Sequence, residues 1–147
     1  MERFKVCLAV HLLIIKDGKI LLQRRNNPNK YAYRKLAMPA GHLEAGENPD
    51  EALIREMKEE LGINLKDFEL VQVMSLNGDT GVYDSYFYLC KDYDGEIRNM
   101  EPENIESVDW YDISEPLEDL IPYEKYALDK YLESGQPFTK FGWHDSH

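Results

Sequence analysis

Two apolar stretches near the N-terminus are spaced like the arms of a β-hairpin. Val6–Ile15 and Lys19–Arg24 are rich in Val, Ile and Leu, and Asp17-Gly18 lies between them. Asp-Gly is favoured in tight turns because both residues tolerate a positive φ. The pattern therefore predicts a hairpin, which is followed by a polar surface loop over Asn26–Arg34.

The rest of the chain alternates between strand-like runs and helix-like periodicity. Apolar runs predict strands over Phe68–Leu76, Val82–Cys90 and Ser107–Tyr111, and the first two flank a loop with two glycines. Helical spacing is found over Asp50–Leu61 and again over Tyr123–Ser134. No internal repeat or linker interrupts this order. The alternation predicts a single α/β domain over residues 1–147, with one mixed sheet and two packed helices.

The first predicted helix has clear signals at both ends. Asn48 is a good N-cap, and Pro49 suits the first turn because its missing N–H needs no partner there. Asp50 and Glu51 favour the positive end of the helix dipole. Gly62 is a natural C-cap. These signals predict a helix that begins after Asn48 and ends before Gly62.

The charge of the chain is strongly acidic and unevenly distributed. The formal net charge is −11. Residues 1–37 carry nine basic and two acidic side chains, a net charge of +7, which leaves −18 on the other 110 residues. The overall sign argues against a nucleic-acid binder held by phosphate neutralisation. The basic quarter is consistent either with a site for an anionic ligand or with a solvated surface.

Hydropathy and cysteine content exclude other classes of protein. Val6–Ile15 is too short to span a bilayer, and a turn signal follows it instead of a signal-peptide cleavage site. Cys7 and Cys90 both lie in apolar strand-like runs. We therefore expect buried free thiols, no disulfide framework and a cytoplasmic protein.

Three carboxylates of the first predicted helix lie on one face. Glu56, Glu59 and Glu60 occupy positions i, i+3 and i+4. Lys58 is expected to point elsewhere and Arg55 to lie at the edge, so no cation offsets their repulsion. The adjoining stripe, which we expect to pack on the sheet, is Leu53, Ile54, Met57 and Leu61. The triplet fits either an exposed acidic face or a site for a hard divalent cation such as Mg²⁺ or Mn²⁺.

The sequence around this helix favours the second interpretation. Residues 41–63 carry a spaced pattern formed by Gly41, Glu47, Arg55, Glu56, Met57, Glu59, Glu60, Gly62 and Ile63. This pattern resembles the Nudix box of the MutT-like Nudix hydrolases. Leu21–Arg25 and Met38–Gly41 are also similar to that family. The resemblance implies the Nudix fold, an α/β/α sandwich with a central mixed β-sheet and a catalytic loop–helix–loop.

The resemblance also implies roles for the residues of the box. The implied metal-binding groups are the carbonyl of Gly41 and the carboxylates of Glu56, Glu59 and Glu60. Mg²⁺ or Mn²⁺ is the implied cofactor. Glu47 and Arg55 are implied to form an ion pair that joins the loop to the helix, and Gly62 is implied to be structural.

The implied reaction is metal-dependent substitution at phosphorus in a pyrophosphate. The metal would neutralise charge at phosphorus and lower the pKa of an attacking water. The general base stays open at this point. Glu56 and Glu59 are candidates within the box, and Glu101 and Glu103 are candidates in the loop before the last predicted strand. Of these two, Glu101 resembles a glutamate common in that loop of related sequences.

Residues outside the box are candidates for contact with the substrate. Arg24 and Arg25 face opposite ways on a strand, so at most one can contact a phosphate; the resemblance favours Arg24, with Arg34 as a loop alternative. Tyr123 and Tyr126 are candidates for stacking on a base. Further candidates, each with a packing or surface role as the alternative, are His11, His42, Tyr31 and Tyr33.

The resemblance favours a MutT-like nucleotide pyrophosphatase that converts a nucleoside triphosphate to monophosphate and pyrophosphate. ADP-ribose-cleaving relatives usually carry a proline downstream of the box, and this chain has none between Pro49 and Pro102. The alternatives are a hydrolase of another nucleoside diphosphate derivative, such as a dinucleoside polyphosphate, and a Nudix-fold sensor without turnover. The expected partner is a small nucleotide, with no nucleic acid and no membrane, and a homodimer is the oligomer that the resemblance suggests.

Overall fold

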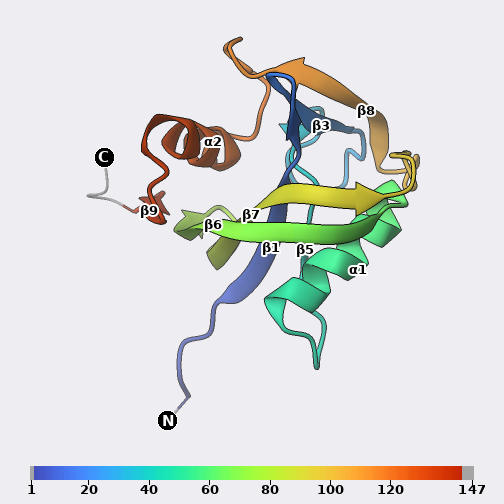
Figure 1. The fold of residues 1–147 in the computed structure, drawn as a ribbon. Helices are drawn as coiled ribbons and strands as arrows, with labels where there is room; N and C mark the ends of the chain where they lie inside the picture. The colour runs from blue at the N-terminus through green and yellow to red at the C-terminus, as the bar shows by residue number, and fades with distance from the viewer. Residues whose placement is uncertain (1, 144–147) are drawn as a thin grey trace.

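Two β-sheets and two helices organise residues 2–143, the part of the chain that the computed structural model describes (Figure 1). The larger sheet has the strand order β5-β1-β7-β6-β9. Its strands are β1 (Cys7–Leu13), β5 (Ala40–His42), β6 (Asn64–Gly78), β7 (Gly81–Asp94) and β9 (Phe138–Phe141). The smaller sheet contains β2 (Ile15–Lys16), β3 (Lys19–Arg25), β4 (Leu36–Ala37) and β8 (Ile105–Asp112). The helices are α1 (Pro49–Leu61) and α2 (Pro122–Ser134).

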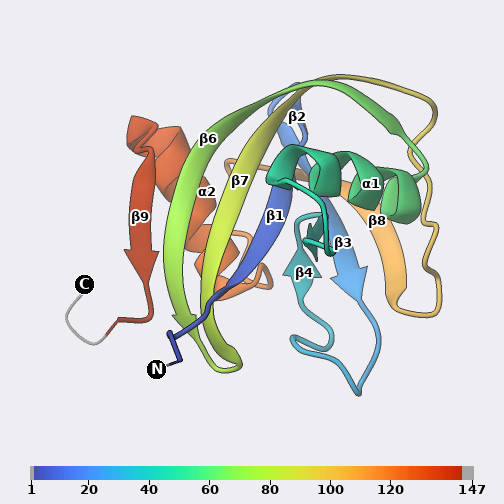
Figure 2. The same cartoon turned by 90° about the horizontal axis from the view of Figure 1, so that it is seen from below.

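The larger sheet is mixed, as the sequence predicted, but the prediction of a single sheet is wrong, because β2, β3, β4 and β8 form a second one. β1 pairs in parallel with β7 and antiparallel with β5. β6 and β7 form a long antiparallel hairpin that turns at Asp79-Thr80. β9 pairs in parallel with β6 at the other edge of the sheet (Figure 2). Helices α1 and α2 lie on opposite sides of this sheet, so the α/β/α arrangement is confirmed (Figure 1).

Strand β1 of the larger sheet is buried on both faces. Val10 and Leu12 of β1 pack in one apolar layer with Leu53 and Met57 of α1. Leu13, on the opposite face of β1, packs in a second layer with residues of α2. A strand that is covered on both sides gains from apolar side chains at successive positions. This double burial explains why the N-terminal segment is an almost continuous apolar run.

The N-terminal hairpin is much shorter than predicted, so the prediction is wrong in extent. Val6–Ile15 is divided between the two sheets, and only the short β2 pairs with β3, with Ile15 opposite Ile20. β1 pairs instead with β5 and β7 in the larger sheet. Since apolar residues cover both faces, local periodicity did not reveal where the chain changes from one sheet to the other.

Helix α1 has the predicted bounds and caps. The Asn48 side chain accepts a hydrogen bond from the Glu51 N–H, and the Glu51 carboxylate accepts one from the Asn48 N–H, which completes a capping box. Gly62 ends the helix in the left-handed region at φ 71°. The predicted apolar stripe is wrong at Ile54, which is 42% exposed.

Two further expectations need correction. The expectation that both cysteines are buried is wrong. Cys7, the first residue of β1, is exposed, and Cys90 is half-buried; neither forms a disulfide within the described residues. Strand β9 was not predicted at all, since its four residues carry no clear alternation. No helix within residues 2–143 has the length and apolar content needed to cross a membrane.

The capping box allows a direct test of local helix stability. We expect Asn48→Ala to lower the free energy of unfolding by about 1 kcal/mol, because the Glu51 N–H loses its acceptor. Asn48→Asp keeps an acceptor oxygen and is expected to stay within about 0.5 kcal/mol of the native protein. Urea unfolding followed by circular dichroism measures both variants. Equal losses in the two variants would contradict the capping role.

Candidate active site

A cavity of about 920 Å³ opens between the two sheets and receives residues from both. Strands β1, β3 and β5 line it, together with α1, the loop before β8, the β6–β7 turn, the start of α2 and β9. This volume is in the range of small-molecule sites. Its wall includes three buried or half-buried glutamates near α1, the exposed Glu44 of the loop before that helix, and a second buried carboxyl at α2.

The three glutamates are Glu56 and Glu60 of α1 and Glu101 of the loop before β8. The loop is held against the end of α1 by backbone hydrogen bonds. Met100 N–H donates to the Glu60 carbonyl at 3.1 Å, and Arg98 N–H donates to the Leu61 carbonyl at 2.9 Å. These bonds bring Glu101, 41 positions downstream of Glu60, to the same cavity.

Burial and nearby negative charge raise the pKa values of Glu60 and Glu101. Burial raises the pKa of Glu60 well above its ordinary value, and the neighbouring Glu56 raises it further. Burial and the charge of Glu56 also raise the pKa of Glu101. The Gln23 amide is 3.4 Å from Glu60 Oε1 and gives little compensation. The site therefore concentrates negative charge that a cation would neutralise.

The donor atoms fit a hard divalent cation. Glu56, Glu60 and Glu101 offer carboxylate oxygens, the ligands that Mg²⁺ and Mn²⁺ prefer. Residues 2–143 contain no group of three His, Cys, Asp or Glu side chains already gathered as a metal site. The side chains would therefore have to move on binding, and the fit rests on their chemistry and shared cavity.

Gly41 contacts the carboxylate of Glu56 with its backbone. A Cβ atom at position 41 would overlap the side chain of Glu56, so no other residue fits there without displacing it. Gly41 lies in β5 opposite Val10 of β1, which fixes its place beside the cavity. The backbone of Gly41 thus stands next to the carboxylates, where the resemblance places it.

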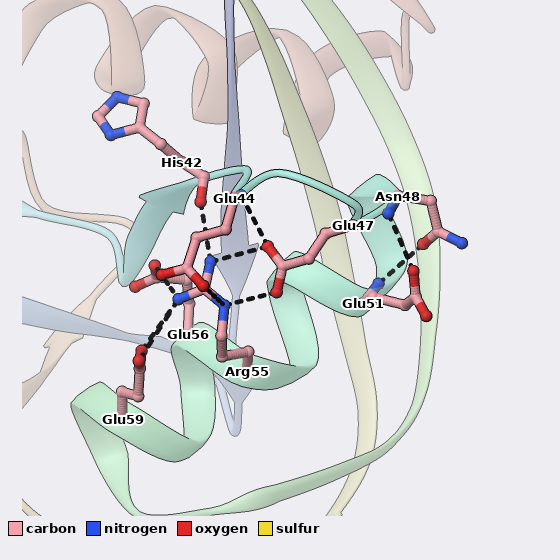
Figure 3. A network of polar contacts seen from close by, with 8 residues as sticks. All are labelled: His42, Glu44, Glu47, Asn48, Glu51, Arg55, Glu56 and Glu59. Carbon is pink, nitrogen blue, oxygen red and sulfur yellow. Dashed lines mark hydrogen bonds and ion pairs between the residues drawn. The ribbon is translucent and has the colours of Figure 1, made fainter.

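Arg55 binds four carboxylates of the loop and helix (Figure 3). Its Nε and Nη2 donate to the two oxygens of Glu47 at 2.6 and 3.0 Å, and Nη2 also donates to the His42 carbonyl at 2.9 Å. This pair lowers the pKa of Glu47 and joins the loop to α1. The Glu47–Arg55 pair that the resemblance implied is present.

The expectation that no cation offsets the acidic face of α1 is wrong. Arg55 Nη1 donates to Glu56 at 2.7 Å and to Glu59 at 2.9 Å, because the long guanidinium reaches along the helix surface. Lys58 does point away, toward Asn64. Glu59 is half-exposed, is held by Arg55 and does not line the cavity. Its metal-binding and catalytic roles stay a prediction that the geometry favours less than those of Glu56 and Glu60.

A buried polar cluster lies where α2 meets the cavity. His11 Nε2 is 3.0 Å from the Tyr123 hydroxyl and 3.7 Å from Glu124 Oε2, and Glu124 Oε1 accepts a hydrogen bond from Met38 N–H at 2.6 Å. Burial lowers the pKa of His11 to about 4 and raises the pKa of Glu124 to about 8. Both side chains are therefore neutral near pH 7. Nothing in residues 2–143 hydrogen-bonds to the hydroxyl of Ser85, which is buried in the same wall.

The two tyrosines predicted to contact a base have different places. Tyr123 lines the cavity and meets His11. Tyr126, one turn later on α2, is not among the residues that line it. Its ring packs on Phe141 of β9 at 5.4 Å, and Lys130 lies over it. The prediction that Tyr126 contacts a base is corrected, because its ring packs instead against β9, a strand that was not predicted.

The choice of Arg24 as the arginine that faces the site is wrong. Arg24 Nη1 donates to Asp119 at 2.9 Å and to the Arg34 carbonyl at 3.0 Å, on the side away from the cavity. Arg25 lines the cavity, since successive strand residues face opposite ways. Arg34 binds Glu106 at 2.9 Å and lies outside the cavity too.

Of the further candidates, three line the cavity and one does not. His11, His42 and Tyr31 belong to its wall, whereas Tyr33 lies with Arg24 and Arg34. Residues that the sequence did not single out also line it, notably Lys30, Glu124 and Phe141. The alternation of side chains along β3 did not show which of Arg24 and Arg25 faces the cavity. No local signal distinguished Glu124 from a surface acid.

Comparisons with known proteins agree with this fold. The family model described as NUDIX domain matches residues 6–131. The 8-oxo-dGTP diphosphatase of Haemophilus influenzae is 31% identical over 101 residues, 69% of this chain and 74% of that protein. The ADP-ribose pyrophosphatase of Methanocaldococcus jannaschii is 46% identical over 69 residues, 46% of this chain and 39% of that protein.

A solved structure gives the same result. The crystal structure of a MutT Nudix hydrolase from Burkholderia pseudomallei superposes with a TM-score of 0.78 at 26% identity, covering 86% of this chain and 98% of that chain. The fold and the family match together define a pyrophosphatase class of enzyme. The chain belongs to the Nudix family, and it is a MutT-like Nudix hydrolase.

The buried carboxyl of Glu124 predicts a dependence of stability on pH. Its pKa is about 8 in the folded protein against an ordinary 4.5, so folding retains a proton that the unfolded chain releases. The stability that this group contributes is complete below about pH 4.5 and is lost as the pH rises toward 8. Glu124→Gln keeps the shape and cannot ionise. We expect its unfolding free energy to fall less between pH 6 and pH 8, by at least about 1 kcal/mol.

Urea unfolding at several pH values measures this difference. Glu133→Gln, on the exposed side of α2, is the matched control and should follow the native profile. His11 acts in the opposite direction, because its lowered pKa removes stability as the pH falls from 6.5 toward 4. Parallel profiles for the native protein and Glu124→Gln above pH 6 would show that Glu124 is ionised in the folded state.

Proposed function

We propose that this chain is a divalent-metal-dependent nucleotide pyrophosphatase that converts a nucleoside triphosphate to monophosphate and pyrophosphate. The observation that carries the proposal is the make-up of one cavity. Three crowded carboxylates at α1 suit a metal and a pyrophosphate, and a mixed polar and apolar wall at α2 suits a heterocyclic base. The cavity joins both features within about 920 Å³.

Glu56 and Glu60 are the residues that would hold Mg²⁺ or Mn²⁺, with the Gly41 carbonyl beside them and Glu59 once it leaves Arg55. A bound divalent ion supplies charge neutralisation at phosphorus and a more acidic water. Arg55 fixes the loop through Glu47 and can release Glu56 and Glu59 one at a time, since it binds each through a single nitrogen. The carboxylates of Glu56 and Glu59 are thus paired with Arg55 in the absence of metal, and a divalent cation would compete with Arg55 for them.

Glu101 is the favoured general base. It lines the cavity, and its raised pKa makes it a better proton acceptor than an ordinary carboxylate. Glu103 is exposed and outside the cavity wall, which removes it from consideration. In the proposed step a water oxygen bonds to one of the two phosphorus atoms of the α–β anhydride. The bond from that phosphorus to the bridging oxygen breaks, its electron pair stays on the leaving pyrophosphate or nucleoside monophosphate, and the water proton passes to Glu101.

Cationic side chains of the wall are placed to bind the phosphates. Arg25 and Lys30 both line the cavity. Arg25 Nε donates to the Tyr31 carbonyl at 2.8 Å, which holds the guanidinium at the wall and leaves its terminal nitrogens for an anion. We assign phosphate contact to Arg25 and Lys30 in place of Arg24 and Arg34. Tyr123 is the aromatic residue assigned to the base.

The relatives support this class of substrate. The Haemophilus influenzae relative is named an 8-oxo-dGTP diphosphatase. Because 8-oxo-dGTP is an oxidised deoxynucleoside triphosphate, this name favours triphosphates as substrates of the present chain. ADP-ribose is the second candidate, because the Methanocaldococcus jannaschii relative is 46% identical over its matched segment. That segment covers less of the present chain, and the downstream proline typical of ADP-ribose-cleaving relatives is missing.

A substrate panel tests the proposal. Nucleoside triphosphates, 8-oxo-dGTP, ADP-ribose and a dinucleoside tetraphosphate are incubated with the protein and Mg²⁺, and phosphate and pyrophosphate are measured separately. We expect pyrophosphate and nucleoside monophosphate from a triphosphate, and no turnover with EDTA. Release of orthophosphate alone, or preferred cleavage of ADP-ribose, would contradict the triphosphate assignment. Melting shifts with nucleotide but no turnover would indicate a sensor.

The carboxylate roles are tested by substitution. Glu60→Gln is expected to lower the Mg²⁺-dependent turnover number at least ~10²-fold, the effect of losing a major transition-state group. Its melting temperature in the absence of metal is expected to be unchanged or higher, because a neutral side chain relieves the buried repulsion. Glu103→Gln is the matched control and should keep full turnover. Full activity of Glu60→Gln would disprove the role.

A further inference from the structure

The C-terminal segment forms a wall of the cavity that lies outside the matched family domain. The family model ends at residue 131, and β9 begins at Phe138. Phe141, the last residue of β9, and the following Gly142 both line the cavity. Part of the candidate binding surface thus comes from a segment that the family model does not describe.

This segment is anchored firmly enough to act as a wall. β9 pairs in parallel with β6 from Val73 to Leu76 (Figure 2). Thr139, which is buried, donates through its hydroxyl to Gln72 Oε1 at 2.6 Å. The Gln72 amide in turn donates to the Ala127 carbonyl of α2 at 2.9 Å. β9 is therefore held both to the sheet and, through Gln72, to the helix.

Beyond β9 the chain closes on the end of β6. Gly142 has φ 85°, and a Cβ atom there would overlap the Asn77 carbonyl oxygen. The Trp143 indole N–H donates to the Ser75 carbonyl at 3.2 Å. We call Gly142 and Trp143, with their contacts to Ser75 and Asn77, the C-terminal clasp. The clasp requires glycine at position 142 and keeps Phe141 in place.

Phe141 lies at the α2 end of the cavity. Its ring packs on Tyr126 at 5.4 Å, and Tyr126 is one helical turn from Tyr123. Phe141 is also paired in register with Leu76, another residue of the cavity wall. This end thus combines the apolar surface of Phe141 with polar groups of Ser85 and Glu124. A flat heterocycle with hydrogen-bonding edges matches this combination.

We propose that Phe141, held by the C-terminal clasp, is a specificity-determining residue that contacts the base of the nucleotide. The proposal rests on the nucleotide assignment above. The clasp sets the position of the aromatic wall, and the wall favours nucleotides whose base presents a large flat surface. Phosphate binding depends on Arg25, Lys30 and the carboxylate end, and is independent of Phe141.

Binding measurements test this without turnover. Titration calorimetry with Mg²⁺ present gives the dissociation constants of dGMP, dCMP and inorganic pyrophosphate. Phe141→Ala is expected to raise the dissociation constant of dGMP about tenfold, the effect of losing one aromatic contact to a base. The dissociation constant of dCMP should rise less, and that of pyrophosphate less than twofold. Phe138→Ala, at the exposed start of the same strand, is the matched control and should leave all three unchanged.

Gly142→Ala tests the clasp while Phe141 is kept. We expect the same selective loss of dGMP affinity, because the added Cβ displaces the chain from Asn77. In a Trp110→Phe background, Trp143 is the remaining tryptophan, and its emission should shift to longer wavelength in Gly142→Ala. Phe141→Leu retains the packing volume and is used if Phe141→Ala melts much lower than the native protein.

The outcomes separate this proposal from the proposed function. If the native protein binds pyrophosphate but neither nucleotide, the nucleotide assignment itself fails. If the native protein binds dGMP, but Phe141→Ala and Phe141→Leu bind it as tightly, the specificity role is overturned. Equal losses for dGMP and pyrophosphate would also overturn it, since they would indicate a structural role alone.

Discussion

The repulsion among carboxyl groups in one partly buried cavity is the constraint on which the rest of the site depends. Glu56 and Glu60 come from one helix face, and Glu101 is brought to them by a loop bonded to the end of that helix. Burial makes each added charge costly, so the pKa values of Glu60 and Glu101 rise. Arg55 relieves part of this strain in the absence of metal, and a metal would relieve more.

The two ends of the cavity use carboxyl groups in opposite ways. At α1 the carboxylates cluster, and their charge is suited to a cation. At α2 a single carboxyl, Glu124, is buried with His11 and Tyr123, and burial keeps it protonated near neutral pH. A protonated carboxyl both donates and accepts hydrogen bonds. The first arrangement suits a pyrophosphate with its metal, and the second suits the edge of an uncharged ring.

The sheets account for how these ends come together. β1 is buried on both faces, so Val10 and Leu12 anchor α1 while Leu13 packs toward α2. His11, between them in the sequence, faces the α2 side and joins the polar cluster. The smaller sheet brings Arg25 to the cavity, and β9 brings Phe141. These residues are distant in sequence but keep their relative positions, because His11, Arg25 and Phe141 each lie on a strand of a sheet.

The sequence alone determined the features that depend on neighbours three or four residues apart. The caps of α1, the shared face of Glu56 and Glu60, and the spacing of the box all follow from helical geometry. Only the tertiary structure decided the features that depend on distant pairing. It divided Val6–Ile15 between two sheets, turned Arg25 and not Arg24 to the cavity, and added β9. The physical reason is that strand alternation offers two equivalent faces, and long-range packing chooses between them.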